Sequence, residues 1–137
     1  IKMWRVVKFL NKILPENNPR YLMGVGTPND IIKATSLGID MFDCVLPTRL
    51  ARHGVAWLKV NRKQLTVNSY RQLDFRKSKL KNDLGPIDKN CSCPACKQKF
   101  SRAYLHHLIK IKEILGIRLL TIHNLYTYLE LMKKLQK

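Results

Sequence analysis

Three cysteines fall within six residues, and this spacing constrains the fold more than any other feature of the sequence. Cys91, Cys93 and Cys96 form a Cys-x-Cys-x-x-Cys cluster, and the only other cysteine is Cys44. Such a cluster is too cramped for a disulfide framework and is typical of a metal site. Zn²⁺ takes four thiolate or imidazole ligands in a tetrahedron, so a fourth ligand must come from elsewhere in the chain. Four protein ligands leave no position for water, which favours one structural zinc ion over a catalytic one.

Three histidines compete for the fourth ligand position: His106, His107 and His123. His123 lies at the predicted start of the last helix, where a ligand would tie that helix to the cysteine cluster. His106 and His107 lie within the preceding predicted helix, where a histidine is more often packed or solvated. Spacing alone favours His123 and leaves the other two open, and three unliganded thiols are the remaining interpretation. Unpaired cysteines indicate a reducing compartment, so we expect the chain in the cytoplasm.

The chain is strongly basic, with 26 Lys and Arg residues against 9 Asp and Glu residues and a net charge of +17. From Arg49 to Arg102 it has fourteen basic and three acidic residues. Such a field attracts polyanions, first nucleic acid and second an anionic membrane surface, whereas a merely solvated surface would not need +17. No apolar run approaches the roughly 18–20 residues that span a bilayer, and no signal peptide is visible. The first residue is Ile1 rather than Met, which suggests a cropped sequence or a broken reading frame.

The first part of the chain predicts an amphipathic helix followed by a βαβ unit. The helix covers residues 4–14, and its apolar face consists of Val6, Val7, Leu10, Ile13 and Leu14. A short strand at 21–23 then leads through Gly24-Val25-Gly26 into a helix at 27–37. Thr27-Pro28 is a typical helix start, and Gly38 is the usual terminating glycine. A second strand at 39–46 completes a unit of the right length for parallel pairing.

The second part of the chain predicts a hairpin, an irregular basic stretch and two helices. Residues 55–60 and 64–68 alternate well enough for two strands joined across residues 61–63. Residues 74–95 are polar, basic and irregular. A helix is predicted from about Ser101 to Leu115, ending at Gly116, and a last helix from near Asn124 to the C-terminus.

Two polar features lie within and directly after the second predicted strand. Asp43 interrupts a strand that otherwise reads as buried, and burying a carboxylate costs several kcal/mol unless it is paired. A chemical role at the carboxyl end of a strand and a structural ion pair with Arg49 are equally open at this stage. Next, residues 47–54 form a predicted compact turn with Arg49 and Arg52 three residues apart. Guanidinium groups so placed suit phosphate or base contacts, and a solvated basic loop is the alternative.

Five blocks of the chain resemble bacterial tRNA-guanine (queuine) transglycosylases, in that family's order and at close to its spacing. The blocks are Pro19 to Gly26, Gly38 to Arg49, the cysteine cluster, Ser101 to Leu108 and Leu119 to Asn124. The resemblance implies an α/β fold: the C-terminal segment of an irregular (β/α)8 TIM barrel with an inserted zinc-binding subdomain and C-terminal helices. Residues 1–54 would hold the last βα units with the nucleophile strand, and residues 55–137 the zinc-binding subdomain and the C-terminal helices.

The resemblance also implies a reaction on tRNA. Asp43 matches the family nucleophile, which attacks C1′ of the guanosine at the anticodon wobble position and forms a covalent RNA–enzyme intermediate. A 7-deazaguanine base then displaces the enzyme, in the manner of a retaining glycosidase. The second catalytic aspartate and the residues that grip the deazaguanine ring belong to the first six barrel units, which have no counterpart in the chain. We therefore expect a dependence on a missing N-terminal barrel part.

The remaining site residues are carried over from the same resemblance. Met23 and Gly24 match the base pocket. The positions matching RNA-binding segments are Gly24, Val25, Gly26, Thr27, Pro28, Asn29 and Asp30, together with Thr48, Arg49, Leu50, Ala51 and Arg52. The positions matching the zinc ligands are Cys91, Cys93, Cys96 and His123. The family also forms homodimers, so a second copy of the chain joins tRNA and the 7-deazaguanine base among the expected partners, whereas no membrane is expected.

Two hypotheses of different classes follow. The first is the C-terminal fragment of a transglycosylase that works only with its missing part. The second is a non-catalytic, zinc-stabilised tRNA-binding module, retained as an accessory or left by a decayed gene. Two barrel units alone would leave open sheet edges and an uncovered core face. Both hypotheses predict this exposure, so it does not distinguish them.

Overall fold

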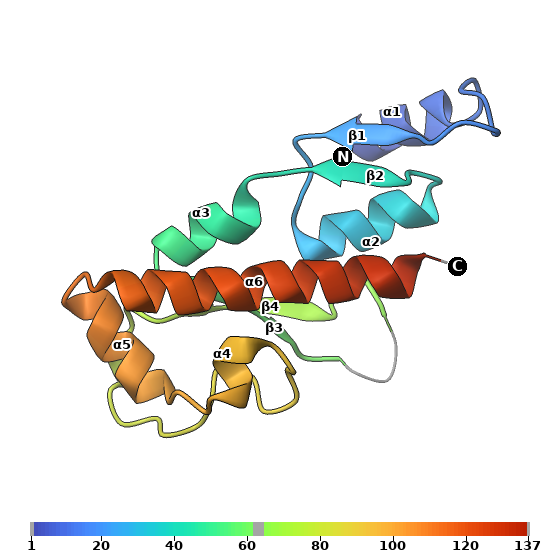
Figure 1. The fold of residues 1–137 in the computed structure, drawn as a ribbon. Coiled ribbons are helices and arrows are strands. Elements are labelled where there is room, and N and C mark those ends of the chain that lie inside the picture. Colours follow the sequence, from blue (N-terminus) through green and yellow to red (C-terminus); the bar gives the residue numbers. More distant parts are fainter. Residues whose placement is uncertain (1, 62–64, 137) are drawn as a thin grey trace.

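A long helix, α6 (Ile114–Leu135), runs through the middle of the molecule (Figure 1). A computed structural model describes residues 2–61 and 65–136. On one side of α6 lie α1 (Lys2–Leu10), β1 (Tyr21–Met23), α2 (Pro28–Ser36), β2 (Met41–Asp43) and α3 (Leu46–Arg52). On the other side lie β3 (Val55–Lys59), β4 (Tyr70–Asp74), a 3-10 turn (Ser78–Leu80), α4 (Pro94–Lys97) and α5 (Arg102–Lys110). The described chain is therefore a mixed helix and strand structure organised around one helix.

The predicted βαβ unit is present. Strands β1 and β2 pair in parallel, with Met23 opposite Asp43, and α2 connects them. The side chain of Thr27 accepts a hydrogen bond from the Asp30 N–H and so caps α2, and Gly38 follows the helix with a φ of 93°. The second strand is shorter than the predicted 39–46, because Leu46 already begins α3. Residues 47–54, predicted as a compact turn, thus lie mostly within a helix.

The predicted N-terminal helix begins earlier and ends earlier than expected, at Lys2 and Leu10 rather than at residues 4 and 14. Of the five residues on its apolar face only Val7 is buried, against Ala34 and Ile39. Val6 and Ile13 are 53% and 64% exposed. The pattern correctly indicated an amphipathic helix, but the described residues do not cover its apolar face.

The hairpin exists with a different second strand. Strand β3 pairs antiparallel with β4, from Val55 opposite Asp74 to Lys59 opposite Tyr70, so 64–68 was the wrong partner. Residues 62 and 63 of the predicted connection and residue 64 of the predicted second strand lie outside the described residues. The alternation was misleading because residues 55–58 are all buried, with packing on both faces of β3. A turn closed by the Thr66 N–H to the Ser69 hydroxyl at 2.7 Å leads into β4.

The boundary between the last two helices was also predicted in the wrong place. Helix α5 ends at Lys110, Lys112 adopts a φ of 60°, and α6 starts at Ile114 rather than near Asn124. Gly116 lies inside α6 and does not terminate α5. A Cβ atom there would stand 2.9 Å from the Cβ of Leu108, so this glycine permits close packing of the two helices.

Two cores flank α6. Leu119 and Leu120 pack with α5, β3 and the cysteine region, whereas Tyr128 and Leu131 pack with α2 and Trp57. Helix α6 therefore connects the cysteine region to the βαβ unit.

Candidate functional site

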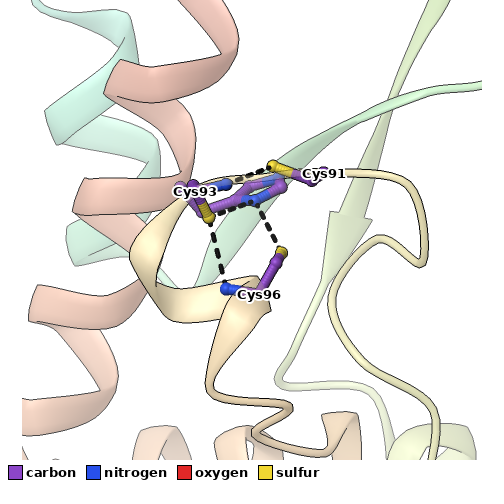
Figure 2. A group of neighbouring side chains, drawn as sticks. Cys91, Cys93 and Cys96 are labelled. Atoms are coloured by element: carbon purple, nitrogen blue, oxygen red, sulfur yellow. Dashed lines mark hydrogen bonds between the residues drawn. The ribbon is translucent and has the colours of Figure 1, made fainter.

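The cysteine cluster is built on the N-terminus of α4. Cys93 caps this helix, and its sulfur accepts a hydrogen bond from the Cys96 N–H at 3.3 Å. The Cys91 sulfur accepts from the Cys93 N–H at 3.5 Å. Pro94 occupies the first turn of α4. Proline is favoured at this position because its fixed φ suits the helix and an N–H here would have no partner within the helix. These contacts turn all three sulfur atoms toward one point, as Figure 2 shows.

His123 completes the group from the middle of α6, nine residues into the helix and not at its start as predicted. Its Nδ1 lies 3.6 Å from the Cys93 sulfur and 3.4 Å from the Cys96 sulfur. The four ligand atoms of Cys91, Cys93, Cys96 and His123 all lie within 4.8 Å of one another. His106 instead places its Nδ1 2.6 Å from the Phe75 carbonyl, and His107 is exposed. The structure thus brings His123 to the thiols and leaves the other two candidates away from them.

The spacing of these atoms fits a tetrahedral metal site. With zinc–sulfur bonds of about 2.3 Å and zinc–nitrogen bonds of about 2.0 Å, the sulfur–nitrogen edge of a tetrahedron is about 3.5 Å. The observed separations between His123 Nδ1 and the two buried sulfurs, 3.6 and 3.4 Å, match that edge. Three thiolates and an imidazole are a donor set that Zn²⁺ prefers. The cluster can therefore hold one metal ion, consistent with structural zinc.

Hydrogen bonding sets the charge of the cluster. Contacts with Cys91 and Cys96 lower the pKa of Cys93 far below its usual value, whereas contacts with Cys91 and Cys93 raise the pKa of Cys96. Burial lowers the pKa of His123, but its contacts with Cys91 and Cys93 outweigh burial and raise the pKa to about 10. The negative charge is thus concentrated at Cys93. The other ring nitrogen of His123, Nε2, lies 2.8 Å from the Trp57 carbonyl and donates to it, so Nδ1 is the nitrogen that faces the thiols and would bind a metal after losing its proton.

Asp43 ends β2, and its side chain is exposed rather than buried. The predicted cost of burying this carboxylate therefore does not arise. The Tyr21 hydroxyl donates to Asp43 Oδ2 at 2.9 Å, and this hydrogen bond raises the pKa of Tyr21. Within the described residues no ion pair joins Asp43 to Arg49. Tyr21 was not identified from the sequence, although its place two residues before Met23 puts both on the same face of β1.

Met23 and Gly24 lie beside Asp43 at the carboxyl end of the parallel pair. Met23 faces Asp43 across the sheet, and the Gly24 N–H donates to the Asp43 carbonyl at 3.0 Å. Gly24 has a φ of 73°, a conformation that favours glycine and turns the chain out of β1. Met23 is 70% exposed. The structure therefore places Asp43, the predicted nucleophile, next to both predicted base-pocket residues at the carboxyl end of β1 and β2.

The loop after Gly24 is anchored to α6. The Tyr128 hydroxyl donates to the Gly26 carbonyl at 2.6 Å, and a Cβ on Gly26 would collide with the Cys44 side chain. Burial raises the pKa of Tyr128, so its hydroxyl stays protonated as a donor. Of the predicted RNA-binding positions in this loop, Gly24 is exposed, Gly26 and Pro28 are buried, and Val25, Thr27, Asn29 and Asp30 are half-buried.

Helix α3 separates its polar and packing residues. Arg49 and Arg52 are exposed, Thr48 and Leu50 are half-buried, and Ala51 is fully buried against the core. Of these five positions only the two arginines therefore present a full side chain to a ligand. They lie on one short helix that starts three residues after Asp43.

A buried residue beside His123 was also missed. Asn124 is 0% exposed, and its side chain makes hydrogen bonds to three backbone groups. Nothing in the sequence marks it, because its partners at Pro47, Val55 and Trp57 are about seventy residues away.

None of the helices within residues 2–61 and 65–136 combines the length and the apolar character that crossing a membrane requires. The four cysteines are free thiols in the structure.

These features define an α/β protein with a three-cysteine, one-histidine metal centre and a carboxylate at the end of a parallel strand. The family model described as Queuine tRNA-ribosyltransferase matches residues 1–137. The chain belongs to the queuine tRNA-ribosyltransferase family.

Individual relatives agree with this family. The chain is 50% identical over 135 residues to a queuine tRNA-ribosyltransferase of Halothermothrix orenii, covering 98% of the chain and 33% of the relative. It is 48% identical over 134 residues to one of Rickettsia prowazekii, with 98% and 34% covered. It is 46% identical over 136 residues to one of Chromobacterium violaceum, with 99% and 34% covered. The chain thus spans about a third of the length of the curated relatives it matches.

Proposed function

We propose that this chain supplies the nucleophile and zinc-binding portion of a tRNA-guanine transglycosylase. The reaction would replace guanine at the anticodon wobble position by a 7-deazaguanine base. One observation carries the proposal: Asp43 lies exposed at the carboxyl end of β2, beside Met23 and Gly24, in a chain of this family. The carboxyl ends of parallel strands are where α/β enzymes place their chemistry.

The geometry supports a double displacement on the ribose. The Tyr21 hydroxyl holds Asp43 Oδ2, so Oδ1 is the free oxygen that attacks C1′ of the nucleotide. The bond from C1′ to guanine breaks as the bond from C1′ to Asp43 forms. The ring nitrogen of the 7-deazaguanine base then attacks C1′ and releases the carboxylate. Asp43 is exposed, so its carboxylate is accessible to the ribose, which a nucleophile requires.

The basic surface supports tRNA as the polyanion. Arg49 and Arg52 project from α3, which follows Asp43 directly, so contacts with phosphates here would hold the anticodon loop next to the carboxylate. The net charge of +17 favours the approach of RNA. In the loop after β1, the exposed Gly24 backbone is the group most accessible to RNA, whereas Asn29 and Asp30 lie half-buried in the first turn of α2.

We assign the metal centre a structural role. Cys91, Cys93, Cys96 and His123 would hold one zinc ion, and four protein ligands leave no coordination position for substrate. When bound, the ion supplies a crosslink between the loop before α4 and α6. The chain's own contribution is the hydrogen bond from His123 to Trp57, which extends that crosslink to β3. Reduced thiols of this kind fit the cytoplasm.

The rest of a barrel would complete the site. Within the described residues two strands form the parallel sheet, and the apolar residues Met3, Val6, Phe9 and Leu10 of α1 are exposed, as is Ile13 just after it. An apolar face of this kind requires cover, and the relatives are three times as long as the chain. We propose that an N-terminal barrel part covers this face and brings the second catalytic acid, whether in the same polypeptide or a separate one. A homodimer would follow the family pattern.

The alternative is a zinc-stabilised tRNA-binding module without catalysis, or the product of a decayed gene. The two-stranded sheet favours it, because the residues that hold a base on the far side of Asp43 are not among those described. Both hypotheses place tRNA on the same surface, so RNA binding alone does not distinguish them.

Covalent trapping separates the two readings. The chain would be mixed with the N-terminal two-thirds of the Halothermothrix orenii relative and an anticodon stem-loop RNA with guanosine at the wobble position. We expect a denaturant-resistant RNA–protein adduct on this chain, and its loss in Asp43→Asn, because an amide is no nucleophile. Asp40→Asn is the matched control, since Asp40 is an exposed carboxylate at the other end of the strand, bonded to the Arg20 N–H at 2.8 Å.

The opposite results are equally informative. An adduct that persists in Asp43→Asn excludes this residue as the nucleophile. RNA binding without any adduct in the mixture favours the non-catalytic module. Robust base exchange by the chain alone contradicts the need for a further barrel part.

A further inference from the structure

A single buried amide joins the metal centre to the segment that carries Asp43 and the arginines. Asn124 follows the metal-site residue His123 on α6 and is 0% exposed. Its Oδ1 accepts from the Trp57 N–H at 3.0 Å. Its Nδ2 donates to the Pro47 carbonyl at 2.9 Å and to the Val55 carbonyl at 3.0 Å. Both amide hydrogens are thus used, so the orientation of this side chain is fully specified.

Two consecutive residues of α6 hold the same residue of β3. The Trp57 carbonyl accepts from His123 Nε2 at 2.8 Å, and the Trp57 N–H donates to Asn124. The other ring nitrogen of His123 faces the cysteine sulfurs. Any shift of α6 that accompanies a change at the metal centre therefore displaces Asn124 and Trp57 together.

The contact with Pro47 extends this link to α3. Pro47 lies in the first turn of α3, and the N-cap residue Val45 makes no side-chain capping bond. Only Cys44 and Val45 separate α3 from β2, so the start of α3 determines how the chain leaves Asp43. Leu50 and Ala51 pack against opposite cores beside α6. Cys44 and Thr48 make local hydrogen bonds at the start of α3, and among the described residues Asn124 is the distant side chain that hydrogen-bonds to this end.

We propose that Asn124 is a positioning residue that couples occupancy of the metal centre to the placement of α3. Through α3 it sets where Arg49 and Arg52 stand relative to Asp43. The RNA consequence rests on the proposed function, whereas the structural consequence does not. A zinc ion far from the reacting carboxylate would in this way control the surface that holds the RNA.

The decisive variant is Asn124→Asp in the full chain loaded with zinc. The carboxylate keeps an acceptor for the Trp57 N–H but replaces both donors with an oxygen that faces two carbonyls. All four metal-site residues are unchanged, so we expect one zinc per chain. By hydrogen exchange we expect the α3 amides to open about tenfold more often, which corresponds to about 1.4 kcal/mol. The dissociation constant for the wobble-guanosine stem-loop should rise by about the same factor.

His106→Ala is the matched control. His106 is 9% exposed, and its side chain contacts the Phe75 backbone at 2.6 Å rather than α3. Loss of this contact should destabilise the α5 region while α3 exchange and RNA affinity stay as in the unchanged chain. An equal rise of exchange in α2, α3 and α5 of Asn124→Asp would mean general destabilisation and would overturn the proposal.

A second measurement starts from the unchanged chain, so its first result does not depend on the stability of a variant. Chelation of zinc from the unchanged chain should raise exchange in α3 more than in α2, and in Asn124→Asp chelation should add little at α3, because the link is already broken. Indifference of α3 to chelation, or additive effects of the two changes, would overturn the coupling. If α3 responds as expected but no stem-loop binds in any sample, the proposed function fails and the coupling stands.

Discussion

Individual side chains decide the chemistry of both centres. Asp43 is oriented by one tyrosine hydroxyl, and the metal site depends on one imidazole from a distant helix. At this scale local pattern identified the three thiols, which the structure brings together with His123, and singled out Asp43, whose role as the nucleophile stays a prediction. It did not identify Tyr21, whose role depends on pairing between strands twenty residues apart.

His123 is the residue on which the metal site depends most. We expect His123→Ala to lose the metal and to lower the free energy of unfolding by more than about 3 kcal/mol, because structural zinc contributes directly to folding. Metal analysis and thermal melting would measure both. His106→Ala should keep stoichiometric zinc, since its side chain faces Phe75. Zinc retained by His123→Ala would contradict the assignment.

The protonation of the cluster predicts how metal binding depends on pH. The pKa of His123 is raised to about 10, so at pH 7 its imidazole carries a proton that zinc must displace. Protons therefore compete with the metal: stabilisation by zinc is present at neutral and higher pH and is lost as the pH falls. Titration calorimetry in buffers of different ionisation enthalpy should show proton release on zinc binding at pH 7. Binding without proton release would contradict this charge state.

Elements decide which residues meet. Helix α6 carries His123 and Asn124 to β3, and Tyr128 to the glycine loop, so one helix positions groups from both cores. Helix α3 presents two arginines because Leu50 and Ala51 turn inward. The prediction of a compact turn for residues 47–54 did not include this separation of exposed and buried helix faces.

The two arginines of α3 predict the salt dependence of RNA binding. Each phosphate contact with single-stranded RNA contributes about −0.7 to the slope of log affinity against log salt concentration. Arg49→Ala combined with Arg52→Ala should therefore reduce the slope by about 1.4, measured by anisotropy with an anticodon stem-loop. Lys133→Ala combined with Lys134→Ala removes the same charge from the exposed end of α6 and serves as the control. Equal effects of the two double variants would indicate charge alone, with no specific contact by α3.

The described residues form three apolar clusters, two of which meet along α6. The metal centre lies in one of these two, whereas the parallel strands pack on the third through Leu22 and Phe42, and Phe42 also contacts the second cluster on α6. Asn124 joins α6 to the start of α3. The exposed apolar face of α1 and the short parallel sheet are features of the molecule as a whole, because both depend on what packs against these elements. They agree with a chain that spans about a third of its relatives.

The sequence by itself determined the features that depend on neighbours within a few residues: the three thiols on one turn and the capped helix between two parallel strands. It placed Asp43 inside the second strand, and the structure places it at that strand's end. Family resemblance then selected His123 from three candidates, and the structure brings it to the thiols. Tertiary structure alone decided the rest. It chose β4 as the partner of β3, placed Gly116 inside a helix, and gave Asn124 its three backbone partners. Local propensity acts over single turns of chain, whereas these choices depend on packing between segments far apart in sequence.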